Sequence, residues 1–156
     1  MKLSDFDKGF YQKSPQTVLG FHGCDRSVAE EILNSQEKHL KPSENTYDWL
    51  GNGIYFWLND PKRAYEWACR TQERYPSKVR EPYVIGAIID LGMCLNFCER
   101  QSITLLQKAY SVLQNQTCKM EFDALDELKN KFPDAGGFEL IRPLDCTVIN
   151  QTHKIV

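Results

Sequence analysis

The strongest strand signal in this chain lies at residues 82–91, which read PYVIGAIIDL. A nearly continuous apolar run that is rich in β-branched residues is typical of a strand covered on both faces. We therefore predict that this segment is the central strand of a β-sheet. A shorter apolar run at residues 17–23 predicts a second strand, which stops at a glycine. Residues 51–57, GNGIYFW, predict a glycine-rich turn that leads into a third strand.

Two short helices are indicated by their start signals. Ser27 and Glu30 form a capping box, so we expect a helix from there to about Asn34. Asp60 is a good N-cap, and Pro61 suits the first helical position of a second helix. The inward face of this second helix is predicted to consist of Ala64, Trp67, Ala68 and Thr71.

Two further helices follow from apolar periodicity in the second half of the chain. Their apolar positions are Ile103, Leu106, Tyr110 and Leu113 in one helix, and Phe122, Leu125, Leu128 and Phe132 in the other. Residues 134–137, DAGG, then break the chain. The last segment, residues 142–150, fits both a helix and a short strand, and we predict a helix.

These elements predict an α+β protein with a small central sheet flanked by helices. A length of 156 residues fits a single domain, residues 1–156, with a polar N-terminal arm at residues 1–15. The net charge is −2, so no global positive field attracts nucleic acid or membrane. The chain has no apolar run of membrane-spanning length, and its N-terminus is too charged for a signal peptide, so we expect a cytoplasmic protein without membrane contact.

The six cysteines form no CxxC pair and have no histidines at zinc-site spacing. We therefore expect free thiols and no metal site.

Two motifs carry the functional signal: Phe21-His22-Gly23-Cys24 at a strand end, and Gly51-Asn52-Gly53-Ile54-Tyr55-Phe56 followed by Lys62-Arg63-Ala64 on a helix. This pair resembles the ADP-ribosyltransferase superfamily, in its diphtheria-toxin and poly(ADP-ribose) polymerase branch. The resemblance covers about residues 17–92. The segment Tyr47-Asp48-Trp49-Leu50-Gly51 resembles a bacterial subgroup that includes toxins and phage-defence proteins.

The resemblance implies an ADP-ribosyltransferase-like fold with NAD as substrate. His22 would bind the adenosine-side ribose, the Gly23 backbone would bind the nicotinamide amide, and Tyr55 would stack on the nicotinamide ring. Gly53 lies in the same segment. Arg63 replaces a family serine, Cys24 replaces a threonine or serine, and the second stacking aromatic falls near Tyr65, Glu66 and Trp67. Taken singly, these residues have plainer explanations: a structural histidine, a turn glycine, or core aromatics.

The family also uses a glutamate on a late strand to stabilise the oxocarbenium-like transition state. Asp145 would take this role if the last segment were a strand. Read as a helix, that segment leaves the chain without the acidic strand, and the fold is then incomplete at its C-terminal end. Glu139, which follows Gly136-Gly137-Phe138, is a further candidate.

The resulting hypothesis is an enzyme that cleaves NAD and transfers ADP-ribose to a protein or nucleic-acid acceptor, acting as a bacterial toxin or defence effector. An antitoxin or another protein would be its partner. The alternative is a catalytically inactive module that binds NAD, ADP-ribose or a protein, or a truncated fragment lacking the acid. The basic stretch at residues 62–80 is either a solvated helix face or a groove for a phosphate-bearing partner or the NAD pyrophosphate.

Overall fold

The computed structural model describes residues 12–46, 48–117, 128 and 141–155. The chain divides into two compact units. We call Lys13–Pro42 with Ile54–Gly92 the sheet unit, and Met1–Gln12 with Ser43–Gly53 and Met93–Val156 the helical unit. The α+β class predicted from the sequence is confirmed.

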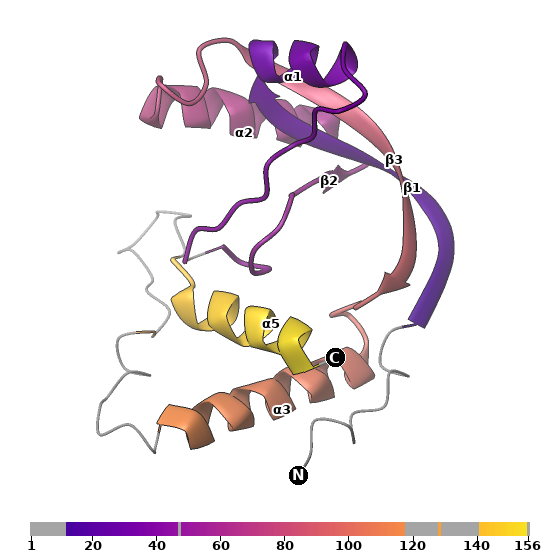
Figure 1. The fold of residues 1–156 in the computed structure, drawn as a ribbon, viewed down its shortest axis with the longest axis vertical. Helices are drawn as coiled ribbons and strands as arrows, with labels where there is room; N and C mark the ends of the chain where they lie inside the picture. Colours follow the sequence, from indigo (N-terminus) through magenta and orange to yellow (C-terminus); the bar gives the residue numbers. More distant parts are fainter. Residues whose placement is uncertain (1–11, 47, 118–127, 129–140, 156) are drawn as a thin grey trace. The chain divides into compact units, whose positions relative to one another are not determined.

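Three strands form the sheet, in the order β2-β1-β3 (Figure 1). These are β1 (Gln12–Asp25), β2 (Trp57–Leu58) and β3 (Pro82–Cys94). Neighbouring strands run antiparallel, and β1 pairs with β2 in the register Gly20↔Leu58 and Phe21↔Trp57. The strand β1 begins at Gln12, within the segment that the sequence suggested was a polar arm.

The prediction that residues 82–91 form the central strand is wrong for the described part of the sheet, because β1 is the middle strand. The apolar character of β3 does not reflect cover on both faces. Ile85 is buried, whereas the Ile88 side chain is 77% exposed. The run thus combines one buried position, Ile85, with half-buried residues and one exposed isoleucine, Ile88.

The two helices of the sheet unit are α1 (Arg26–Leu33) and α2 (Pro61–Arg74). The N-cap of α2 is Asp60, with Pro61 in the first turn, as predicted. The predicted capping box, with Ser27 as the N-cap, is wrong. The N-cap of α1 is Asp25, two residues earlier, and the Ser27 backbone N–H donates to its side chain.

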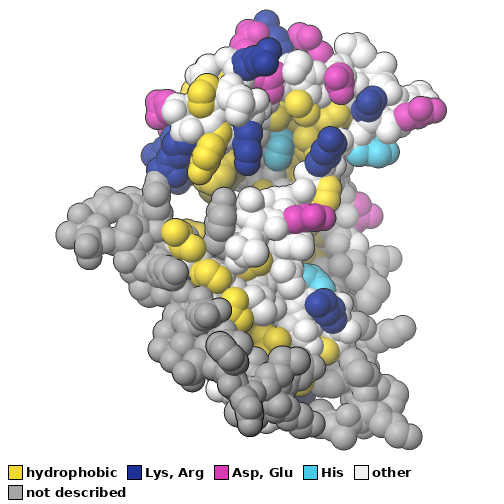
Figure 2. Space-filling model, turned by 60° about the vertical axis from the view of Figure 1, so that its left-hand side comes forward, with side chains coloured by type: hydrophobic (Ala, Val, Ile, Leu, Met, Phe, Trp, Pro, Cys, Tyr) yellow, Lys and Arg dark blue, Asp and Glu magenta, His cyan; other side chains and the backbone are white. Residues whose placement is uncertain are grey.

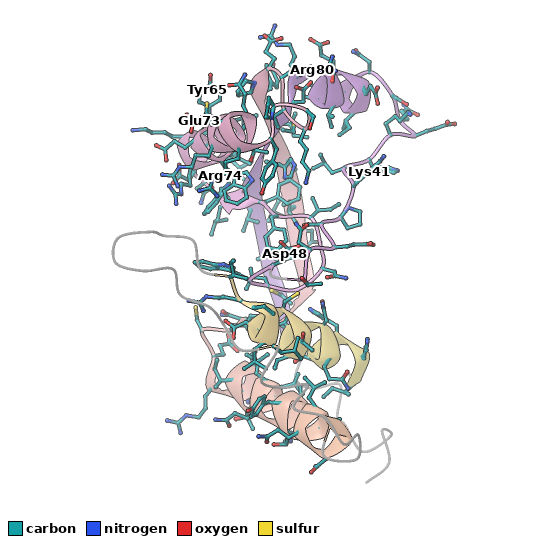
Figure 3. The ribbon with its side chains drawn as sticks, turned by 90° about the vertical axis from the view of Figure 1, so that its left-hand side faces the viewer. Lys41, Asp48, Tyr65, Glu73, Arg74 and Arg80 are labelled. Carbon is teal, nitrogen blue, oxygen red and sulfur yellow. The ribbon has the colours of Figure 1, made fainter. Side chains whose placement is uncertain are left out.

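These helices pack on the sheet through small side chains and one apolar cluster. Ala64 and Ala68 of α2 are fully buried, as predicted, but Trp67 is 56% exposed and does not face inward. On α1, Ala29 packs with Cys24 of β1 and Ile85 of β3. Figure 3 shows α1 and α2 on opposite sides of the strands, so this sheet is flanked by helices.

The helical unit contains α3 (Arg100–Thr117) and α5 (Pro143–Ile155), which lie side by side and run in opposite directions (Figure 1). Their shared core consists of Leu105, Ala109, Val148 and Ile155. The helical prediction for the last segment is confirmed. The helix predicted from Phe122 to Phe132 and the break at residues 134–137 lie outside the described residues, apart from residue 128, which is in a turn.

The loop Ser43–Gly53 is held within the helical unit. Ser43 and Gly53 form an isolated antiparallel bridge, and the Asn52 backbone N–H donates to Asn150 Oδ1 of α5 at 2.8 Å. Gly51 has a φ of 75°, and a Cβ there would meet Asn150 Oδ1 at 2.5 Å. Glycine at position 51 is therefore required by both backbone conformation and space.

Within the described part of the chain, no helix has both the length and the apolar character needed to cross a membrane. The cysteines described there, namely Cys24, Cys69, Cys94, Cys98 and Cys146, are free thiols.

Candidate functional site

A hydrogen bond joins the two sequence motifs inside the sheet unit. His22, on β1, lies with its Nδ1 atom 2.8 Å from the backbone carbonyl oxygen of Tyr55, 33 positions away in sequence. Tyr55 lies in the segment that leads into β2 and not in the strand itself, which begins at Trp57. The His22 side chain thus connects β1 to the segment before β2, next to the paired residues Phe21 and Trp57.

This contact fixes the hydrogen-bonding state of the imidazole. A carbonyl oxygen only accepts, so Nδ1 must carry the hydrogen and donate it. In the neutral ring, Nε2 is then the acceptor. The half-buried His22 therefore presents a nitrogen that can accept a hydrogen bond from a hydroxyl group, such as that of a ribose.

The aromatic ring beside His22 is that of Phe56, whose centroid lies 5.7 Å from the imidazole centroid at an interplanar angle of 56°. Sequence reasoning did not single out Phe56, although it belongs to the GNGIYF motif. Successive side chains of an extended segment leave the backbone in opposite directions. The Tyr55 and Phe56 side chains are thus expected to point to opposite faces of this segment. His22 contacts the backbone of Tyr55 and the ring of Phe56.

Gly23 has a packing role in this structure. A Cβ added at Gly23 would collide with the Ala64 carbonyl oxygen of α2 and lie 3.2 Å from the Ala68 methyl group. The helix α2 can approach β1 this closely only because residue 23 lacks a side chain. The predicted contact of its backbone with nicotinamide stays a prediction.

Cys24, which follows Gly23 on β1, is buried in the cluster with Ala29 and Ile85. Burial raises the pKa of its thiol, and the neighbouring Asp25 charge raises it further. Cys24 is therefore a neutral core side chain and not an activated nucleophile.

Asp25 ends β1 next to this cluster and was missed by sequence reasoning. Its carboxylate accepts from the backbone N–H and hydroxyl of Ser27 and from the backbone N–H groups of Arg80 and Glu81. These hydrogen bonds hold the pKa of Asp25 well below its usual range. An acidic residue just before a helix start was the sequence signal that could have identified it.

The candidate residues on α2 are partly or largely exposed. Arg63 lies between two partners: its Nη1 atom is 3.2 Å from Glu66 Oε2, and its guanidinium carbon is 5.3 Å from the Trp57 ring centroid. Tyr65 is 49% exposed. Tyr65 and Trp67 are thus exposed and accessible to a ligand. The simpler explanation, that both are core aromatics, is wrong.

The remaining candidates belong to the helical unit. Gly53 bridges Ser43 and has open space where a Cβ would be. Asp145 lies in the first turn of α5, where its carboxylate is 2.9 Å from Arg142 Nη1. The strand on which a catalytic Asp145 depended is therefore absent at this position. Glu139 lies outside the described residues.

Comparison with known proteins gives little information on function. No known protein family matches the chain, and no solved structure matches it. An uncharacterized protein of Methanocaldococcus jannaschii is 43% identical over 47 residues, which make up 30% of this chain. The match spans 21% of that protein, about a fifth of its length.

Proposed function

We propose that this chain binds NAD and cleaves its nicotinamide–ribose bond, transferring ADP-ribose to a macromolecular acceptor as an ADP-ribosyltransferase of the toxin or defence type. The observation that supports the proposal most is the hydrogen bond from His22 Nδ1 to the Tyr55 carbonyl. It joins the His-Gly strand end to the GNGIYF segment, which are the two motifs of the resemblance.

The chemistry assigned to His22 follows from its hydrogen-bonding state. With Nδ1 donating to Tyr55, the neutral Nε2 accepts from a ribose hydroxyl and orients the adenosine side of NAD. The Tyr55 ring provides a flat surface for nicotinamide at low entropic cost. Within the sheet unit, Arg63 is a further proposed NAD contact, whereas Tyr65 lies on the opposite flank of α2.

Two substitutions of His22 separate ligand binding from structural support. In His22→Asn, the side-chain amide occupies roughly the place of Nδ1, so it can still bond the Tyr55 carbonyl but lacks a group at Nε2. In His22→Gln, the amide reaches the Nε2 place instead. If Nε2 binds ribose, calorimetry should show NAD affinity falling about fivefold or more in His22→Asn and less in His22→Gln. Equal NAD affinity of His22→Asn and wild type would mean that His22 only joins the two segments.

Two adjacent substitutions identify the stacking ring. Tyr55→Ala should weaken NAD binding by about 1 kcal/mol, the scale of an aromatic contact, and Phe56→Ala is the matched control in the next position. If only Phe56→Ala lost NAD affinity, the ligand would contact the Phe56 ring beside His22, and Tyr55 would not be the stacking residue. Unchanged affinity in both variants, with an intact fold, would contradict a nicotinamide site here.

A second candidate function is an inactive module that binds NAD, ADP-ribose or a protein. The observation that favours it is the pairing of the Asp145 carboxylate with Arg142 in the first turn of α5. A carboxylate engaged in this way is less suited to stabilise developing positive charge, which is the task of the missing acid. Release of free nicotinamide from NAD by the wild-type chain distinguishes the two candidates, because only the transferase cleaves NAD.

A further inference from the structure

One flank of α2 carries a row of cationic side chains interrupted by an exposed tryptophan. The row consists of Arg63, Trp67, Arg70 and Arg74, and we call it the α2 stripe. The spacings of four, three and four residues place these side chains on one line along a helix. Trp67 is 56% exposed, and the Arg63 side chain is 42% exposed.

The stripe lies apart from the buried face and from the opposite flank of α2. Ala64 and Ala68 face the sheet. Figure 3 shows Tyr65 and Arg74 pointing away from the helix on opposite sides, as their 180° separation on a helical wheel requires. Figure 2 shows Lys and Arg side chains in the upper part of the molecule, interspersed with Asp and Glu and next to hydrophobic side chains.

Charge is concentrated in this region of an otherwise acidic chain. Residues 62–80 contain six Lys or Arg and two Glu, whereas the whole chain has a net charge of −2. The ion pair between Arg63 and Glu66 is exposed on both sides, so little free energy is lost when a ligand phosphate replaces Glu66. The surface therefore complements a chain of negative charges.

The aromatic component indicates what carries those charges. Trp67 stands between Arg63 and Arg70, and the Trp57 ring lies beside the Arg63 guanidinium, 5.3 Å from it. An exposed indole ring between arginines matches an unpaired base between phosphates, because every base has a face that can stack. A duplex would leave Trp67 without a base to stack on. The stripe spans roughly 16 Å between Arg63 and Arg74, long enough for several phosphates of one strand.

We propose that the α2 stripe binds single-stranded nucleic acid, with phosphates on Arg63, Arg70 and Arg74 and a base stacked on Trp67. The stripe shares Arg63 with the proposed NAD site, so the tests leave Arg63 unchanged. They use Arg70, Arg74 and Trp67, which are outside the proposed NAD site, and they contain no NAD.

The experiment measures fluorescence anisotropy of labelled oligouridylate and oligothymidylate of about 12 nucleotides, titrated with the full chain at several salt concentrations. Wild type should bind, and its affinity should fall with salt. Arg70→Gln and Arg74→Gln should each reduce the slope of log K against log salt by about 0.7, the value for one lost phosphate contact. Trp67→Ala should weaken binding about fivefold or more, while Trp67→Phe should stay close to wild type.

Lys62→Gln is the matched control, because Lys62 is exposed on the same helix but lies about 100° around it from Arg63. It should leave the salt slope nearly unchanged. Tighter binding of either oligonucleotide supports the proposal, and the preferred one shows whether the stripe favours RNA or DNA.

Three results would overturn the proposal. These are no binding at low salt, equal binding of a duplex of the same length, or a loss in Lys62→Gln as large as that in Arg70→Gln. The last result would indicate diffuse electrostatic attraction without a defined stripe.

Discussion

At Asp25, one carboxylate connects three segments of the sheet unit. It ends β1, caps α1 through Ser27, and accepts the backbone N–H groups of Arg80 and Glu81 just before β3 at 2.6 and 3.0 Å. Charge-assisted hydrogen bonds of this kind are stronger than neutral ones. Asp25 therefore stabilises the junction of the end of β1, the start of α1 and the residues just before β3.

Replacing Asp25 by asparagine removes that charge and is expected to destabilise the fold by about 1 kcal/mol or more. The pKa of Asp25 is depressed in the folded state, so its contribution is present above the unfolded pKa of about 3.9 and is lost as the pH falls through the folded value. Urea unfolding of wild type and Asp25→Asn at several pH values measures this. The difference between the two should shrink as the solution is made more acidic, and a difference that grows would show that the charge opposes folding.

Gly23 allows α2 to pack closely against β1, because it has no side chain. Gly23→Ala would push a methyl group into the Ala64 carbonyl, so we expect α2 to move from β1 at a cost of roughly 1–3 kcal/mol. Gly53→Ala is the control, because nothing lies within 4 Å of a Cβ at that position. Thermal unfolding should show a lower midpoint for Gly23→Ala alone. Equal midpoints for the two variants would mean that α2 does not pack against β1 as described.

Among the elements of the helical unit, α5 holds the loop Ser43–Gly53 through Asn150. Its amide nitrogen donates to Asn52 Oδ1 at 3.1 Å, while its oxygen accepts from the Asn52 backbone. Asn150→Ala should therefore speed amide hydrogen exchange of residue 52, with little change in the core of α3 and α5. Uniform acceleration throughout α5 would contradict this local role.

Local signals predicted the described helices, apart from the N-cap of α1, but not the order of the sheet. Asp60 with Pro61 marks the start of α2 because a cap depends only on adjacent residues. The middle position of β1 depends on pairing between distant segments, which apolar runs do not encode. In the same way, the apolar pattern predicted an inward Trp67, but small alanines allow close packing of α2 and leave the indole outside.

At the candidate site, the resemblance assigned the two motifs to one NAD site but did not predict how they contact each other. The His-Gly and GNGIYF motifs do meet, through His22 and the Tyr55 carbonyl. Phe56 as the neighbouring ring and Asp25 as a hydrogen-bonding centre were not predicted, because they depend on side-chain direction and on a contact 55 positions away.

For the whole molecule, the proposed activity is cleavage of NAD. Mass spectrometry of NAD incubated with the full protein tests it by detecting free nicotinamide. Wild type should release nicotinamide, and His22→Asn should release less. Neutralising the true catalytic acid should slow release by roughly 10²–10³ with little effect on NAD binding.

Asp145→Asn and Glu139→Gln measured beside wild type identify that acid. Release that is unaffected in both variants would assign the acid to another residue and leave the claim intact. We expect wild type to release nicotinamide in a reaction that depends on His22. Wild type that binds NAD but releases no nicotinamide would contradict the claim and favour the inactive binding module.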